Sequence, residues 1–353
     1  MAAENLAYNL STSPATASTF AKTSPTEPAQ GEDLGSYEQA YMITSTILFS
    51  AVIIFGVLLN SIIVFTVYRW PEMRTPCNLL IVNIAVSDLA VASLVAPLQI
   101  IEVFVGWPFG NFLCEVLFPM QEVFVTVSVV THTTIALERF RAIVRPLKRR
   151  LSLRNTKLII FAIWPLCYIT SALPLAPVLK VQSDDGMDLC QPRWPFELYR
   201  PIYQVYLVIL FIAIPLFIQT MAYFKILKTL RSRLTPLCAL PLNRKLSRAI
   251  QYRKRKRLIK TLTILVFAFQ VCYVPRGVMM MLDEFAQGYL DMNSYAYAFV
   301  VTLILFYLKH VMNPIILFAT SRDFRRWNFL HIFCHWHCYE ETVCYKWLLT
   351  SNR

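Results

Sequence analysis

The sequence predicts an all-α protein, a bundle of seven transmembrane helices, and three observations support that fold class. Hydrophobic residues make up 56% of the 353 residues, charged residues make up 16%, and the mean hydropathy is +0.50. The hydrophobic residues gather in seven long stretches. Each stretch can cross a hydrocarbon core of about 30 Å, which takes roughly 20 helical residues. Helices are expected because lipid offers no partners to backbone N–H and C=O groups.

The seven predicted spans share their length and their scarcity of charge. They fall at residues 43–68, 78–101, 112–137, 156–179, 203–227, 258–282 and 295–319. Pro275 and Pro314 predict kinks in the sixth and seventh spans, because proline removes a helical hydrogen bond. We expect one transmembrane domain over residues 43–320. The polar segment 1–42 is predicted to be disordered, and residues 321–353 to form an amphipathic helix and a tail.

Positive charge predicts how the chain sits in the membrane. Lysine and arginine gather after the first, third, fifth and seventh spans, and the longest run is Arg253–Arg257. The positive-inside rule places these connections in the cytoplasm, with the N-terminus outside the cell and the C-terminus inside. The run Arg253–Arg257 also has the composition of a nucleic-acid-binding patch. Because apolar sequence begins at Leu258, we favour a segment beside anionic lipid and expect no nucleic-acid partner.

Polar residues inside the spans point to a family, because such residues are costly in lipid and therefore mark function. Together with Trp164 and the prolines as further landmarks, the marked positions in chain order are Asn60, Asp88, Glu138-Arg139-Phe140, Trp164, Pro215 with Tyr223, Cys272-Tyr273-Val274-Pro275 and Asn313-Pro314. This ordered set resembles the rhodopsin-like, or class A, G-protein-coupled receptors over roughly residues 43–330. The resemblance implies a plasma-membrane receptor that activates a heterotrimeric G protein through Glu138, Arg139 and Tyr223. Arrestin is a further candidate partner.

A disulfide is implied by the same resemblance. Cys114 opens the third span, and Cys190 lies in the second outer loop. Both face the oxidising side of the membrane, where a disulfide can persist. The resemblance pairs them, and two free thiols are the alternative.

Covalent modification is predicted near both ends of the chain. Asn9-Leu10-Ser11 is a glycosylation sequon in the segment placed outside. The stretch from Ser321 to Phe333 resembles the family's short helix on the inner leaflet. Three cysteines after it are predicted palmitoylation sites, namely Cys334, Cys338 and Cys344. A metal site with the interleaved His331, His335 and His337 is the alternative, although structural zinc sites usually show two separated ligand pairs.

Two departures from the family pattern affect the inner end. Leu317 stands where the seventh-helix motif normally ends in tyrosine, so Tyr223 loses its usual hydroxyl partner in the active state. Arg255 stands where an acidic partner for Arg139 is common, so that lock between helices is not expected.

Lys309 is the most unusual residue of the spans, because a lysine in the middle of a membrane needs a partner. Retinal-binding opsins carry a seventh-helix lysine, but their position matches Tyr307 here. Two residues along a helix correspond to about 200° of rotation. Lys309 is therefore expected to point away from the ligand cavity and toward Asp88, and an opsin is disfavoured.

The resemblance also implies an internal sodium site, which this chain modifies. The polar shell would comprise Asp88, Ser128, Asn313 and, in support, Asn60. Lys309 and His310 stand where the family usually has small or neutral polar groups. We expect the ammonium of Lys309 to satisfy Asp88 and replace sodium. The alternative is that Lys309 reaches elsewhere and sodium still binds.

The outer half of the bundle predicts a peptide ligand. Gln121 replaces the third-helix aspartate of amine receptors and resembles neuropeptide Y, orexin and RFamide-type peptide receptors. Glu284, with Asp283 beside it, matches an acidic position that such receptors use against a ligand arginine. An acidic mouth steers cationic ligands. The alternative is that the outer loops are acidic only because positive charge is concentrated in the inner loops. The remaining predicted ligand contacts are Trp194, Met280, Glu102 and Tyr307.

Arg276 is expected to face the same cavity. An unpaired guanidinium there would cost several kcal/mol, so a partner is predicted. Glu122 is the first candidate and Glu102 the second. A ligand carboxylate is the rival partner and would indicate a lipid or acid ligand.

These observations favour a receptor for a basic neuropeptide. A class A receptor for a lipid or small carboxylate is the first alternative, and a membrane transporter is the second. Transporters often contain internal repeats, and none is evident here. His132 and His310 are isolated, so no enzyme activity, cofactor or metal site is expected.

Overall fold

The computed structural model describes residues 29–146, 151–184, 187–232, 242–286, 292–321 and 324–325. Within them, seven helices are long and apolar enough to cross a membrane. They run over Tyr41–Arg69, Pro76–Val105, Gly110–Val144, Leu153–Val178, Tyr199–Arg231, Lys256–Phe285 and Ser294–Thr320. Each overlaps one predicted span, so the seven-helix prediction is confirmed. Asn9, Cys334, Cys338 and Cys344 lie outside the described residues, as does most of the predicted surface helix.

Four of the spans contain a π-helical turn between or after α-helical segments. The α-helices are α2 (Ala29–Ala51), α3 (Val57–Arg69), α4 (Pro76–Ala90), α5 (Ala96–Val105), α6 (Gly110–Val144), α7 (Leu153–Cys167), α8 (Tyr199–Val208), α9 (Ile214–Ser232), α10 (Leu242–Phe285) and α11 (Met292–Thr320). The π-helical turns are η1 (Val52–Gly56), η3 (Val91–Val95), η4 (Tyr168–Ala172) and η6 (Ile209–Ala213). Two short 3₁₀ turns are η2 (Pro71–Met73) and η5 (Ala176–Val178).

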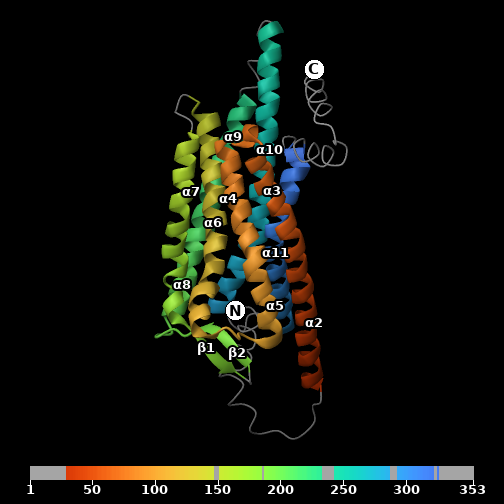
Figure 1. Cartoon of the computed structure of the whole chain (residues 1–353), viewed down its shortest axis with the longest axis vertical. Helices are drawn as coiled ribbons and strands as arrows, with labels where there is room; N and C mark the ends of the chain where they lie inside the picture. The colour runs from red at the N-terminus through yellow and green to blue at the C-terminus, as the bar shows by residue number, and fades with distance from the viewer. Residues whose placement is uncertain are drawn as a thin grey trace.

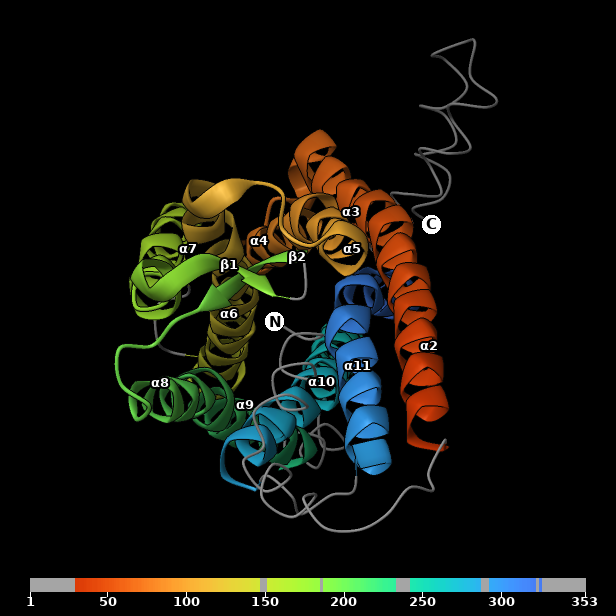
Figure 2. The same cartoon turned by 90° about the horizontal axis from the view of Figure 1, so that it is seen from below.

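The helices stand side by side along the long axis of the molecule (Figure 1). Seen along that axis, they form a ring in which α11 lies between α10 and the first span (Figure 2). The long helix α6 packs against α4, α7 and α9, and α10 packs along α11. A cavity can therefore form where α6, α10 and α11 approach one another.

Capping residues fix where two spans begin. The hydroxyl of Thr75 accepts a hydrogen bond from the Asn78 N–H at 3.2 Å, and Pro76 is the first residue of α4. The hydroxyl of Ser152 likewise accepts from the Asn155 N–H at 3.1 Å at the start of α7. Both residues supply the oxygen that the first turn of a helix lacks.

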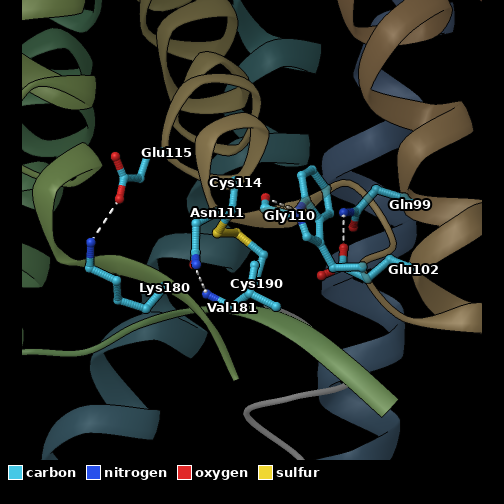
Figure 3. Close-up of a disulfide and its surroundings, with 10 residues drawn as sticks. Gln99, Glu102, Gly110, Asn111, Cys114, Glu115, Lys180, Val181 and Cys190 are labelled. Atoms are coloured by element: carbon cyan, nitrogen blue, oxygen red, sulfur yellow. Dashed lines mark hydrogen bonds and ion pairs between the residues drawn. A yellow bond between two sulfur atoms is a disulfide. The ribbon is translucent and has the colours of Figure 1, made fainter. Parts of the chain in front are cut away.

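A β-hairpin covers one end of the ring. Strands β1 (Leu179–Asp184) and β2 (Met187–Pro192) pair antiparallel. A disulfide joins Cys190 on β2 to Cys114 in the first turns of α6, as the resemblance implied (Figure 3). Beside it, the Asn111 side chain accepts a 2.8 Å hydrogen bond from the Val181 N–H, and Lys180 pairs with Glu115 at 2.7 Å. We call this the disulfide end of the bundle, and the opposite end the Arg139 end.

Gly106 permits the close approach of the hairpin to the second span. Its φ is +74°, and a side-chain carbon there would lie 2.4 Å from the carbonyl oxygen of Asp188. The next residue, Trp107, donates its backbone N–H to that same oxygen at 2.5 Å. Only glycine fits this position without displacing the hairpin.

The first helix begins earlier than expected. It starts at Ala29, so residues 29–42 are helical rather than part of a disordered segment. Extension is inexpensive here, because the transmembrane span already provides the helical nucleus and each added residue only propagates it. Residues 1–28 lie outside the described residues.

We predict that the disulfide is required for a stable disulfide end. Replacing Cys114 and Cys190 together with serine should lower the free energy of unfolding by about 2–5 kcal/mol, because the bridge constrains a long loop in the unfolded chain. Thermal unfolding of the purified protein measures the loss. Peptide mapping of the non-reduced protein is the direct check, and free thiols at both positions would contradict the assignment.

Candidate functional site

A cavity opens between α5, α6, α8, α10 and α11, on the part of α6 that follows the disulfide. Six of the predicted ligand-binding residues line it, namely Gln121, Glu122, Arg276, Met280, Asp283 and Tyr307. The other three, Glu102, Trp194 and Glu284, are not among its lining residues. Five of the six lining side chains are polar or charged, within walls that are otherwise mostly apolar and aromatic.

The acidic pair of α10 already has an internal partner. Arg200, the second residue of α8, places Nη2 3.2 Å from Oδ2 of Asp283 and Nε 3.0 Å from Oε2 of Glu284. The first contact has hydrogen-bond geometry, and the second is a close ion pair without that alignment. Tyr295 of α11 also donates its hydroxyl to Oδ1 of Asp283 at 2.7 Å. The pair therefore connects the fifth, sixth and seventh spans.

Arg276 is not paired as predicted. Its guanidinium lies over the Phe299 ring, 5.1 Å from the centroid. No ion pair joins it to Glu122 or Glu102 among the described residues; instead, Glu102 accepts a 2.7 Å hydrogen bond from the Gln99 side chain. An aromatic face can stabilise a guanidinium by about 0.5–2 kcal/mol, which offsets part of the cost of burying its charge. Arg276 and Glu122 thus remain available inside one cavity.

Two other predicted contacts have intramolecular roles. The Gln121 amide donates to the Tyr307 hydroxyl at 3.2 Å, which links α6 to α11 across the cavity. Trp194 packs its ring 5.4 Å from that of Tyr203, behind the hairpin. Gln121 faces the cavity, whereas Trp194 supports its wall.

An internal polar cluster lies further along the bundle and is centred on Asp88. The side chain of Asp88 is fully buried, with 0% exposure. One carboxylate oxygen lies 2.7 Å from Nδ1 of His310, and the other accepts from the Asn313 amide at 2.9 Å. Asn60 donates to the backbone carbonyl of His310 at 3.0 Å. Three spans therefore meet around one carboxylate. The side-chain hydroxyl of Ser128, which is also buried, has no hydrogen-bond partner among the described residues.

Lys309 does not pair with Asp88, which corrects the prediction. His310 takes that place, and Nζ of Lys309 has no hydrogen-bond partner within the described part of the chain. The ammonium lies among three rings, 5.3 Å from the centroid of Phe269 and 5.6 Å from those of Tyr273 and Phe306. Neighbouring positions on a helix point about 100° apart. His310 therefore reaches the carboxylate, and Lys309 is turned into an aromatic cage.

At the Arg139 end, Nε of Arg139 lies 2.7 Å from a carboxylate oxygen of Glu138. The Tyr223 hydroxyl is buried and has no hydrogen-bond partner among the described residues. Leu317, whose exposure is 2%, packs in the same apolar cluster as Tyr223. The tyrosine hydroxyl and the leucine thus occupy one apolar region without a polar contact between them.

Sequence reasoning missed the residues that surround these charges. Arg200 was not among the predicted site residues, and its place at the start of a span was the available signal. The cage of Phe269, Tyr273 and Phe306 gave no separate signal, because aromatic residues at helical spacing are common in any bundle.

Comparisons with known proteins agree with this architecture. The family model described as 7 transmembrane receptor (rhodopsin family) matches residues 59–317. The neuropeptide Y receptor type 2 of Cavia porcellus is 28% identical over 287 residues, covering 79% of this chain and 73% of the relative. The Homo sapiens receptor of that name is 27% identical over the same shares. A QRFP-like peptide receptor of Branchiostoma floridae is 26% identical over 298 residues, covering 81% and 77%.

We predict that sodium does not stabilise this protein. His310 and Asn313 already fill both oxygens of Asp88, and the Lys309 ammonium on the same helix disfavours a further cation. The unfolding temperature of the purified protein should therefore be equal in sodium chloride and in N-methylglucamine chloride at one ionic strength. The double variant His310→Ser with Lys309→Asn should gain a sodium-specific rise. A sodium-specific rise in the wild type would contradict the prediction.

Proposed function

The chain belongs to the rhodopsin family of seven-transmembrane receptors, and we propose that it is a cell-surface receptor that binds a basic peptide outside the cell and activates a heterotrimeric G protein inside. Its relatives include the neuropeptide Y receptor type 2 and a QRFP-like peptide receptor. The family signals by changing shape rather than by catalysing a reaction.

One observation carries the choice of a basic ligand, namely the charge at the mouth of the cavity. Asp283 and Glu284 contribute two negative charges and Arg200 one positive charge, which leaves an excess of one carboxylate. A partly buried negative excess attracts and steers a cationic group. Peptides that contain arginine provide such a group at the end of an extended chain.

The proposed orientation follows from the chemistry of the two ends. A disulfide persists on the oxidising, extracellular side, and Cys114 and Cys190 mark that end. The positively charged connections of the sequence are expected on the cytoplasmic side, which is the Arg139 end. The ligand would therefore enter past the hairpin.

Polar side chains deeper in the cavity can bind the rest of the peptide. Arg276 can donate to a carbonyl or carboxylate, and Glu122 can accept from an N–H group. Gln121 can exchange its Tyr307 hydrogen bond for one to the ligand. A peptide backbone carries donors and acceptors side by side and suits such a mixed lining better than a fatty acid does.

Activation is proposed to be a population shift between two packings of the bundle. Peptide contacts on α10 and α11 favour the state in which the inner half of α10 swings outward around Pro275. That movement opens a cytoplasmic cleft at Arg139. The free energy comes from the difference in ligand affinity between the two states.

The proposal is tested by screening a neuropeptide library, including neuropeptide Y and QRFP-type peptides, on cells that express this chain. G-protein activation by a peptide with a basic end supports it. Activation by a fatty acid and by no peptide would reject the peptide ligand. Measurable solute flux without G-protein activation would indicate a transporter.

We predict that Glu284→Gln weakens binding of the basic peptide about tenfold, or about 1.4 kcal/mol. The substitution keeps the shape of the side chain and removes the charge that attracts the ligand arginine. Competition binding with a labelled peptide measures the change. Glu115→Gln removes a carboxylate at the same end of the molecule, where Glu115 pairs with Lys180, and should have no effect. Equal losses in both variants would point to a general electrostatic effect.

We also predict that Arg139→Ala keeps peptide binding and loses G-protein activation. Arg139 lies at the opposite end from the cavity, and its role is to contact the G protein once the cleft opens. Guanine-nucleotide exchange in membranes, measured beside peptide binding in the same preparation, separates the two effects. Full signalling by this variant would reject the assigned role.

A further inference from the structure

We propose that Arg200 is a specificity-determining residue: it occupies the cation site of the ligand in the free receptor and must be displaced when a basic peptide binds. This inference rests on the proposed function. It reverses the simple expectation that every charged residue of the mouth contributes favourably to ligand binding.

The contacts of Arg200 match those a ligand arginine would make. Its guanidinium presents Nη2 to Asp283 and Nε to Glu284, at 3.2 Å and 3.0 Å. The side chains of these three residues are 23%, 10% and 12% exposed, so the group is largely withdrawn from solvent. The guanidinium hydrogen-bonds to Asp283 and lies in ion-pair contact with Glu284, so one cation serves both carboxylates, as the cationic end of a ligand would.

The same carboxylates cannot serve two guanidinium groups equally well. Oδ2 of Asp283 and Oε2 of Glu284 face Arg200, and Oδ1 of Asp283 accepts from Tyr295. A second cation beside Arg200 would find these three oxygens occupied and would meet a like charge at close range. A ligand arginine therefore obtains a full pairing only when Arg200 leaves.

Arg276 provides an internal comparison. It lies two helical turns from Asp283 on the same helix and lines the same cavity, yet no carboxylate pairs with it in the described residues. The pairing of Arg200 is therefore not shared by Arg276. The acidic pair already holds an internal cation, whereas Arg276 is a cavity cation with no ion-pair partner among the described residues.

Displacement makes recognition an exchange of one cation for another. The ligand gains only the difference between its own pairing and that of Arg200. Its apparent affinity equals its affinity for the free site multiplied by the fraction of receptors in which the site is free. The free fraction belongs to the receptor alone, so it lowers the affinity of every ligand whose cation needs this site by the same factor. A ligand with a neutral group at that place is not affected by the competition.

The test uses the most potent basic peptide of the screen in three forms, with its arginine intact, replaced by lysine, or replaced by neutral citrulline. Against the full-length receptor Arg200→Gln, the arginine form should bind about fivefold tighter than against the wild type, because the site is free. The lysine form should gain by the same factor, because it needs the same site, and the citrulline form should not change. Lys180→Gln removes a cation of the Lys180–Glu115 pair and should leave all three affinities unchanged.

A second measurement needs no ligand. Without Arg200 the two carboxylates lose their counter-charge, so the purified Arg200→Gln receptor should unfold about 2 °C or more below the wild type. Lys180→Gln should unfold with the wild type. An unchanged temperature for Arg200→Gln would show that the contact is not formed in the free receptor and would overturn the proposal.

The remaining outcomes are also decisive. A lower unfolding temperature with unchanged or weaker arginine-peptide binding would make Arg200 a structural brace and reject the displacement. If no peptide of the screen binds the wild type, the proposed function fails and the inference falls with it. If the arginine peptide binds but loses nothing on citrulline replacement, only the inference fails.

Discussion

The buried carboxylate of Asp88 is the constraint on which the rest of the bundle depends. A charged oxygen inside the hydrocarbon core has no water to donate hydrogen bonds to it, so its partners must come from neighbouring helices. His310 and Asn313 supply them from α11, and Asn60 holds the backbone of His310 from α3. A separate bond, from the Asn83 amide to the Thr131 hydroxyl, joins α4 to α6. These bonds fix the register of the spans, which apolar packing alone would leave free to slide, because lipid and leucine are equally apolar.

The two ends of the cavity differ in whether their charged side chains are paired within the protein. At the mouth, the carboxylates of α10 are satisfied from within by Arg200. At the floor, Arg276 rests on an aromatic ring and stays open to a ligand acceptor. Binding of a ligand cation at the mouth therefore replaces Arg200, whereas binding of a ligand acceptor by Arg276 at the floor adds a new interaction. The two steps favour an elongated ligand that can reach both.

The sequence was sufficient for the spans, the disulfide pair and the cavity-lining positions of Gln121 and Arg276, because each follows from hydropathy or from an ordered motif. The sequence did not predict which charged side chains contact one another. Lys309 was expected on Asp88, but its neighbour His310 makes that contact. The choice depends on rotation of about 100° between adjacent helical positions and on aromatic rings from another helix, and neither is visible in a motif. Arg276 lacks its predicted carboxylate for the same reason, since Phe299 of α11 provides an alternative surface.

The aromatic cage of Lys309 suggests how the cavity communicates with the polar cluster. Tyr273 and Phe306 line the cavity on one side and contact the buried ammonium on the other. A peptide that shifts either ring changes the environment of Lys309, and the next residue on the same helix is the partner of Asp88. A ring–cation contact is worth about 1–2 kcal/mol when desolvated, and 1 kcal/mol changes a two-state ratio about fivefold. Displacing one ring would therefore bias the packing around Asp88 without any ligand contact to that carboxylate. The two helices that form the cage of Lys309, α10 and α11, both reach from the cavity toward the Arg139 end.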